Sequence, residues 1–361
     1  MAERVVLHIG TMKSGSSYLQ HLLFAQRSEL AAAGVLVPGR DRVEQIDALM
    51  QGRLPRGPRD LWEAMRSEVR DHPGTAVLSH ELLGAATDKV FRHLLPDLEP
   101  APVEVVVTVR DLNRTLVSMW QETVQNGRTW TWDDYYAAAE AAAPYRRTEE
   151  PDPQSAGGTF WKQQDVARMV RRWADRLGAD RVTVVVVPPK GADRTELPRR
   201  FADAAAIPLD PTVPSPRPNE SLGLASVLVV RRLNELLEEQ GHPWPDAMMV
   251  RKRLLAKKVL AARAADEPRL SLDPPSWVRE QTDATVAALQ ESGVRCVGDW
   301  SDLAPVPVPG VRPEDVDPHL VTEAALAALA AMVARAAGGK GPGGLTAARP
   351  VRRHGSGAPD R

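Results

Sequence analysis

Short runs of apolar residues alternate along the chain with longer stretches in which apolar positions recur every three or four residues. The short runs cover residues 5–9, 35–37, 76–79, 103–109 and 182–187. Such runs predict strands buried on both faces of a parallel sheet, above all residues 103–109, most of which are β-branched. The longer stretches, such as residues 17–33, 112–125 and 160–177, have the spacing of amphipathic helices. This alternation predicts an α/β fold with a doubly wound, mostly parallel sheet.

The pattern changes after about residue 206. Residues 208–218 contain five prolines and predict a linker, whereas residues 221–292 are almost entirely helical in periodicity. From residue 338 onward the chain is rich in Gly, Pro and Arg without periodicity. We therefore expect an α/β domain over residues 1–225, a helical C-terminal subdomain over 226–335 and a disordered tail over 336–361. Residues 39–58 and 144–158 predict irregular loops, where an acceptor pocket would be built.

The composition excludes some classes of function. The chain has 361 residues, and its 46 Lys and Arg against 47 Asp and Glu give a net charge of −1. This balance argues against a protein that coats nucleic acid or an anionic membrane, so we expect neither partner. The single cysteine, Cys296, excludes a disulfide framework and a cysteine-rich zinc site. We find no signal peptide and no apolar stretch near the roughly 18 residues of a membrane span, so we expect a soluble, cytoplasmic protein.

The loop Gly10-Thr11-Met12-Lys13-Ser14-Gly15-Ser16-Ser17 lies between the first predicted strand and the first predicted helix. Backbone N–H groups and the dipole at a helix N-terminus favour a bound anion, and glycines let the chain curl closely around a phosphate. Gly10 and Gly15 match the glycines of a P-loop, G-x-x-x-x-G-K-[ST]. However, Ser16 stands where that motif has its lysine, and Lys13 comes three residues earlier. The spacing leaves a P-loop kinase or NTPase and a protein with another phosphate ligand as alternatives.

A second group of candidate residues follows the strongest predicted strand. Arg110 comes directly after residues 103–109, at the end of a parallel strand where ligands bind in open α/β sheets. Ser118 lies eight residues further on, about two turns into the next predicted helix, where it could share a ligand with Arg110. The planar guanidinium suits phosphate oxygens. These residues predict a second phosphate contact.

Both segments resemble those of the sulfotransferases that use 3′-phosphoadenosine 5′-phosphosulfate (PAPS). Lys13-Ser14-Gly15-Ser16-Ser17 resembles the family's 5′-phosphosulfate loop, and Arg110 with Ser118 resembles its 3′-phosphate motif, with Leu112 in place of the usual proline. The resemblance covers about residues 1–225 and is nearest to the glycan-type enzymes. It implies in-line transfer of a sulfuryl group to a hydroxyl or amine of a small-molecule or glycan acceptor, without a metal. The implied cofactor contacts are Thr11, Lys13, Ser14, Gly15, Ser16, Ser17, Arg110 and Ser118.

The resemblance also suggests a general base and further contacts. The family's base, histidine or glutamate, follows the strand equivalent to residues 76–79, and here His80 and Glu81 stand side by side. Since neighbouring strand residues point to opposite sides, only one is expected to face the ligand, and we favour Glu81. Lys13 would neutralise charge on the departing phosphate.

Two features of the resemblance lie further along the chain. Asn219 and Ser221 resemble a segment at the lip of the family's cofactor site. The family's basic, glycine-rich loop is missing, and Arg231-Arg232 or residues 251–253 could replace it. A non-catalytic cofactor-binding protein on the same fold is a further alternative.

Overall fold

The computed structural model describes residues 2–54, 56–144, 150–214, 221–242 and 248–338. Six parallel strands form one sheet in the order β2-β3-β1-β4-β5-β6. Their bounds are β1 Arg4–His8, β2 Val35–Leu36, β3 Thr75–Ser79, β4 Val103–Val109, β5 Val182–Val186 and β6 Arg295–Val297. The predicted α/β class with its doubly wound parallel sheet is confirmed.

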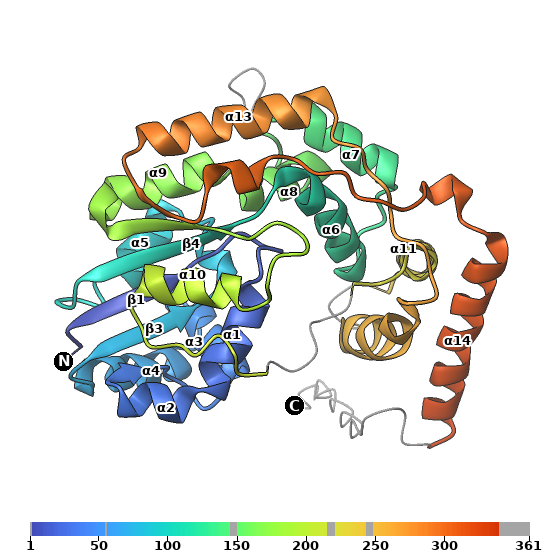
Figure 1. Cartoon of the computed structure of the whole chain (residues 1–361). Coiled ribbons are helices and arrows are strands. Elements are labelled where there is room, and N and C mark those ends of the chain that lie inside the picture. Colours follow the sequence, from blue (N-terminus) through green and yellow to red (C-terminus); the bar gives the residue numbers. More distant parts are fainter. Residues whose placement is uncertain (1, 55, 145–149, 215–220, 243–247, 339–361) are drawn as a thin grey trace, which may run out of the picture.

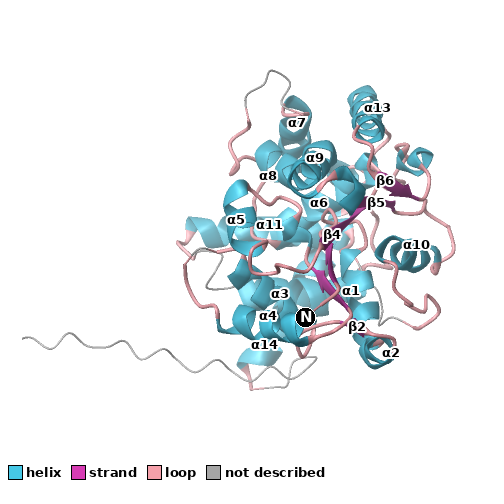
Figure 2. Ribbon diagram, turned by 90° about the vertical axis from the view of Figure 1, so that its left-hand side faces the viewer, coloured by secondary structure: helices cyan, strands magenta, loops and turns pink. Residues whose placement is uncertain are grey.

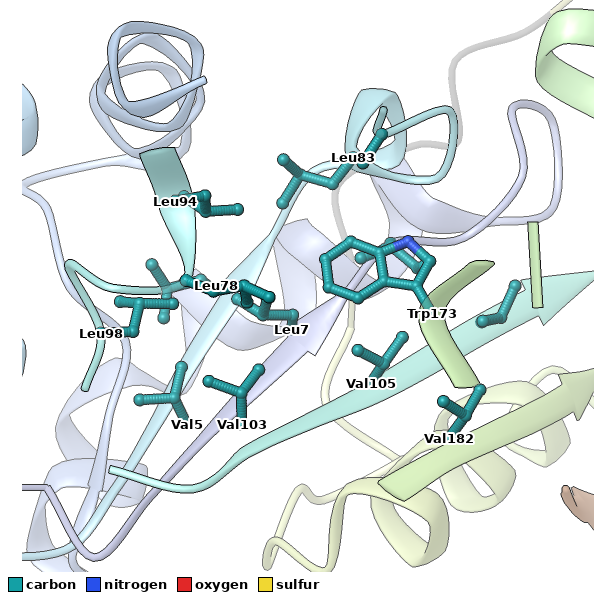
Figure 3. Packing of buried hydrophobic residues seen from close by; sticks show 14 of the residues in the cluster. Val5, Leu7, Leu78, Leu83, Leu94, Leu98, Val103, Val105, Trp173 and Val182 are labelled. Carbon is teal, nitrogen blue, oxygen red and sulfur yellow. The ribbon is translucent and has the colours of Figure 1, made fainter. Parts of the chain in front are cut away.

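Helices cover both faces of the sheet (Figures 1 and 2). On one face lie α3 (Arg42–Gly52), α4 (Asp60–Asp71), α5 (Asp88–Leu94), α9 (Val166–Leu177) and part of α13 (Ser276–Glu291). Figure 3 shows how Trp173 of α9 packs over Val105 and Val182 on this face. The other face is covered by α1 (Ser16–Ala25), α2 (Arg27–Ala32) and α10 (Glu196–Ala205). Neighbouring residues of β1, such as Val6 and Leu7, point into opposite cores, because successive side chains of a strand alternate between its two faces.

A third core joins helices that lie beyond the carboxyl ends of the strands (Figure 1). It includes α6 (Leu112–Gln125), α7 (Trp132–Ala141), α8 (Ala156–Gln164), α11 (Leu224–Glu239) and α14 (Pro318–Ala336). A π-helix, Met249–Val259, and a 3₁₀-helix, Leu260–Arg263, pack against α6, α11 and α14. Further short 3₁₀-helices are Glu81–Leu83, Ala179–Arg181, Trp300–Leu303 and Pro313–Asp315.

Some local predictions are wrong. Residues 39–58, expected to be an irregular loop, contain α3, whose N-terminus is capped by the Asp41 carboxylate accepting from two backbone N–H groups. Residues 17–33 form two helices instead of one. The strand β6 was not predicted, because only three residues of this exposed edge carry the pattern. The division into domains at residue 225 stays a prediction, and the predicted tail lies almost wholly outside the described residues.

The helix α14 departs from the expectation that no stretch could cross a membrane. It has 19 residues with a mean hydropathy of 1.3, which is long and apolar enough by length and composition alone. The prediction missed it because alanine is its commonest residue, so no strongly apolar run marks it. Leu326, Leu329 and Val333 are exposed on this helix.

Candidate functional site

Three strand ends meet at one edge of the sheet. Because β1, β3 and β4 are parallel neighbours, the segments that follow His8, Ser79 and Val109 leave the sheet on the same side. These segments are the loop at residues 10–17, the pair His80 and Glu81, and the segment that begins at Arg110. The topology therefore brings together the three groups of residues that the sequence marks as candidates.

Buried polar side chains hold the loop from beneath. Thr108 of β4 accepts a hydrogen bond through its carbonyl from the Thr11 N–H (2.9 Å), and its hydroxyl lies 2.7 Å from the Ser14 hydroxyl. The ring of His8 bonds to Ser79 (2.7 Å) and Thr108 (3.1 Å). Burial lowers the pKa of His8 to about 4, against the opposing charge of Glu81, so the ring is neutral at neutral pH.

The loop itself requires an unusually close approach to β4. A Cβ atom on Gly10 would lie 2.1 Å from the Thr108 hydroxyl oxygen, so no other residue fits there unless the Thr108 side chain or the loop shifts. Thr11 and Ser14 are buried, and their hydroxyls bond within this anchored layer and do not line the cleft described below. Their predicted contacts with a ligand stay predictions.

The second half of the loop leads into the N-terminus of α1. Lys13 has a φ of 67° and Gly15 one of 87°, both in the left-handed region, and Gly15 directly precedes α1. Ser16 and Ser17 occupy the first turn, where backbone N–H groups have no intrahelical partner. The left-handed turns followed by a helix N-terminus form a concave array of donors for an anion.

A cleft of about 770 Å³ opens above the loop. Lys13, Gly15, Ser16, Ser17, Glu81, Arg110, Ser118 and Ser221 all line it, together with residues of α1, α3, α6 and the π-helix. Its Lys, Arg, Asp and Glu lining comprises Lys13, Arg42, Arg110, Lys252, Lys257 and Lys258 against Glu81 and Glu122. The excess of cations makes the cleft suited to a polyanionic ligand.

Arg110 and Ser118 contact each other directly, and the ligand that the sequence predicts between them stays a prediction. The guanidinium Nη2 donates to the Ser118 hydroxyl (2.6 Å) and to the carbonyl of Arg114 (2.8 Å). Burial lowers the pKa of Arg110 to about 10, with a partly opposing effect of Asp111. Its Nε is buried and has no hydrogen-bond partner among the described residues. A buried donor without a partner is costly and suits a ligand that accepts from it.

Glu81 and His80 face different surroundings. The Glu81 carboxylate lines the cleft and accepts from the Gln20 amide (3.2 Å), whereas His80 is buried with no hydrogen bond from either ring nitrogen to a described residue. Burial alone would raise the pKa of Glu81, but the adjacent His80 ring (3.7 Å) and Gln20 lower it to about 2. Glu81 is therefore ionised at neutral pH and open to the cleft.

One carboxylate in the cleft was missed from the sequence. Glu122 of α6 accepts hydrogen bonds from Lys13 Nζ (3.3 Å) and from Lys252 Nζ (2.7 Å). Burial would raise the pKa of Glu122, but the positive charges of these lysines and of Lys257 lower it to about 2. No motif marks Glu122, and the only signal was its place one turn beyond Ser118 on the same helix.

The π-helix supplies lysines to the same cleft. Lys252 and Lys257 both line it, although residues five apart would lie about 140° apart around an α-helix. The i→i+5 bonding of a π-helix brings such residues onto one face. Of the two basic segments considered as replacements for the missing loop, residues 251–253 thus reach the cleft through Lys252. Arg231 instead pairs with Glu235 and bonds to the Thr129 carbonyl.

Of the two remaining candidate residues, Ser221 and Asn219, the structure describes only Ser221. Ser221 is exposed and lines both the main cleft and a neighbouring pocket of about 330 Å³ that also includes Arg110 and Ser118. Asn219 lies outside the described residues. Within the described part of the chain, no group of three or more His, Cys, Asp or Glu side chains is arranged to hold a metal ion.

Comparisons with known proteins give a distant structural similarity and no match in sequence. No known protein family and no curated protein matches the sequence. The structure is similar to a sulfotransferase from Alicyclobacillus acidocaldarius, with a TM-score of 0.38 and 14% identity. The similarity covers 71% of this chain and 97% of that one. A likeness at this level carries no argument about activity, which has to be argued from the cleft.

Proposed function

We propose that the chain is a sulfotransferase that moves a sulfuryl group from PAPS to a hydroxyl or amine acceptor. The observation that carries the proposal is one cleft lined by two separate groups of candidate anion ligands, the loop at residues 10–17 and the pair of Arg110 and Ser118. A ligand with phosphates on two positions of its ribose, 3′ and 5′, matches this arrangement better than a triphosphate, whose charge lies on the 5′ side alone. The position of Lys13 before Gly15 supports the same choice.

The residues present fit the two phosphate groups of PAPS. The unpartnered Nε of Arg110 and the Ser118 hydroxyl provide donors for the 3′-phosphate. The N–H groups of the left-handed turn and of the first turn of α1 provide donors for the 5′-phosphosulfate, with Lys13 beside them. Lys252 and Lys257 add positive charge from the π-helix.

Bound PAPS would supply an activated sulfuryl group, and the protein would supply position and charge. Lys13 would stabilise the negative charge that develops on the 5′-phosphate as the sulfuryl group leaves. Glu81 is our choice of base because its carboxylate lines the cleft, whereas His80 is buried. A pKa of about 2 makes Glu81 a weak base, but reach comes before basicity in the choice of a proton acceptor. The acceptor would be a small molecule or a glycan.

The direct test is calorimetry with adenosine 3′,5′-bisphosphate, the product of the transfer. We expect binding by the intact protein and a loss of at least about tenfold in affinity in Lys13→Ala and in Arg110→Ala, because each removes a charged contact to phosphate. Lys190→Ala, at an exposed lysine that does not line the cleft, is the matched control and should bind as the intact protein does.

The outcome also separates the alternatives. Absence of binding by the intact protein, or unchanged binding in both cleft variants, would refute the proposal. Tight Mg²⁺-dependent binding of ATP instead would favour a P-loop kinase or NTPase. Binding without sulfate transfer to any acceptor in a broad screen with labelled PAPS would indicate a non-catalytic protein.

A further inference from the structure

Glu122 places a negative charge inside a cleft whose charged lining residues, apart from Glu81, are otherwise cationic. Its side chain is 13% exposed, and it contacts a lysine from the loop and a lysine from the π-helix at the same time. Neither contact is local, because the pairs are separated by 109 and 130 residues. The sequence motifs assign Glu122 no role, and the proposed binding and transfer steps do not use it.

We propose that Glu122 is an internal counter-ion that holds Lys13 and Lys252 in place and competes with the ligand's 5′-phosphate for them. The inference rests on the proposed function for the identity of the ligand, but the competition applies to any anion that reaches Lys13. Glu122 acts on the ligand through the lysines and is therefore a positioning residue.

The geometry shows that Glu122 would weaken the binding of an anion at Lys13. A phosphate oxygen that accepts from Lys13 Nζ would share this ammonium group with the Glu122 carboxylate, which already lies 3.3 Å from it. Two anions on one ammonium lie within roughly 6 Å of each other, where like charges repel strongly at the effective dielectric constant of a protein. Removal of the carboxylate charge therefore strengthens anion binding.

The same contact gives Glu122 its positioning effect. Lysine has a long flexible side chain, and a charged partner restricts it to one side of the cleft. Lys13 stands on a left-handed backbone position that fixes where its side chain starts, and Glu122 fixes where its ammonium group ends. Without that partner the ammonium group samples more positions, so transfer slows even though the ligand binds more tightly.

The test compares two substitutions at this position. Glu122→Gln keeps the shape and one acceptor oxygen but removes the charge, and we expect it to bind adenosine 3′,5′-bisphosphate about tenfold more tightly. We expect its turnover of PAPS, measured as release of adenosine 3′,5′-bisphosphate with water or an acceptor present, to be slower. Glu122→Asp keeps the charge but shortens the reach, so its affinity should stay near that of the intact protein while turnover falls.

Controls separate this effect from loss of structure and from failure of the proposed function. Glu291→Gln removes one exposed carboxylate at the end of α13 and should change neither quantity. Thermal unfolding of each variant shows whether it folds. Inorganic pyrophosphate is the second probe, because it tests competition for Lys13 without a nucleoside.

The outcomes are distinct. Tighter pyrophosphate binding by Glu122→Gln, with no binding of adenosine 3′,5′-bisphosphate to any form, would support the counter-ion and refute the proposed function. Equal or weaker binding of both probes by a folded Glu122→Gln would overturn the inference and leave the proposed function standing. A purely structural role would lower affinity and turnover together in both substitutions.

Discussion

The buried ring of His8 makes a quantitative prediction about how stability depends on pH. Burial lowers the pKa of His8 from 6.5 to about 4 in the folded protein. The unfolded chain therefore binds a proton more readily than the folded chain does between these values. Because the unfolded state takes up more protons, the free energy of unfolding falls as the pH drops below the unfolded pKa.

The magnitude follows from the two pKa values. The difference between 6.5 and about 4 corresponds to about 3.4 kcal/mol over the whole range. Between about pH 7.5 and about pH 5.5, His8 accounts for a loss of about 1.3 kcal/mol, with the rest lost as the pH approaches the folded value. This loss is large against a typical total stability of about 5–15 kcal/mol.

The assay is urea denaturation at these two pH values in the intact protein and in His8→Gln. Glutamine offers one acceptor and one donor to Ser79 and Thr108 but does not titrate. We expect the variant to be less stable overall, but to lose about 1.3 kcal/mol less than the intact protein on acidification. His319→Gln, on the exposed start of α14, is the control and should leave the pH dependence unchanged. Equal pH dependence in His8→Gln and the intact protein would refute the reasoning.

Two further predictions concern the same edge of the sheet. Thr108→Val removes the hydroxyl that joins His8 to Ser14. It should lower the free energy of unfolding by about 1–3 kcal/mol in urea denaturation, since a buried donor or acceptor loses its partner. Thr183→Val on β5 is the comparison, and an equal loss of stability in both variants would contradict the role of the network. Glu81→Gln should reduce the rate of sulfate transfer by about 10²–10⁴-fold, as expected for loss of a base, while calorimetry shows retained binding of adenosine 3′,5′-bisphosphate; an undiminished rate would shift the role to His80.

Much of the fold could be predicted because the strands are buried on both faces. Val103–Val109 has a nearly continuous β-branched pattern that only a central parallel strand explains well. The prediction of an irregular loop at residues 39–58 was wrong for a physical reason. The glycines, prolines and arginines of this segment resemble a loop, but Asp41 caps a helix whose buried residues are Gln45, Ala48, Leu49 and Gly52. A polar core residue such as Gln45 hides the apolar stripe on which the prediction depends.

The candidate site could be predicted only where its residues follow strands. The loop at residues 10–17 and Arg110 were found because position after a parallel strand implies the binding edge. Thr11 and Ser14 look like ligand donors in the sequence, yet the structure turns their hydroxyls toward Thr108. Side-chain direction within a loop depends on tertiary contacts that no spacing rule encodes.

The charge arrangement of the cleft is the feature that could least be predicted from the sequence. Lys252 and Lys257 share a wall only because their helix is a π-helix; as an α-helix the segment would turn one of them away. Lys13, Glu122 and Lys252 come from three separate segments and meet through the packing of α6 against the π-helix. The loop motif therefore predicts where an anion would bind, whereas residues outside the motif would set the strength of that binding. Substitutions at Glu122 would test that separation directly, because they change the partners of Lys13 without changing the loop.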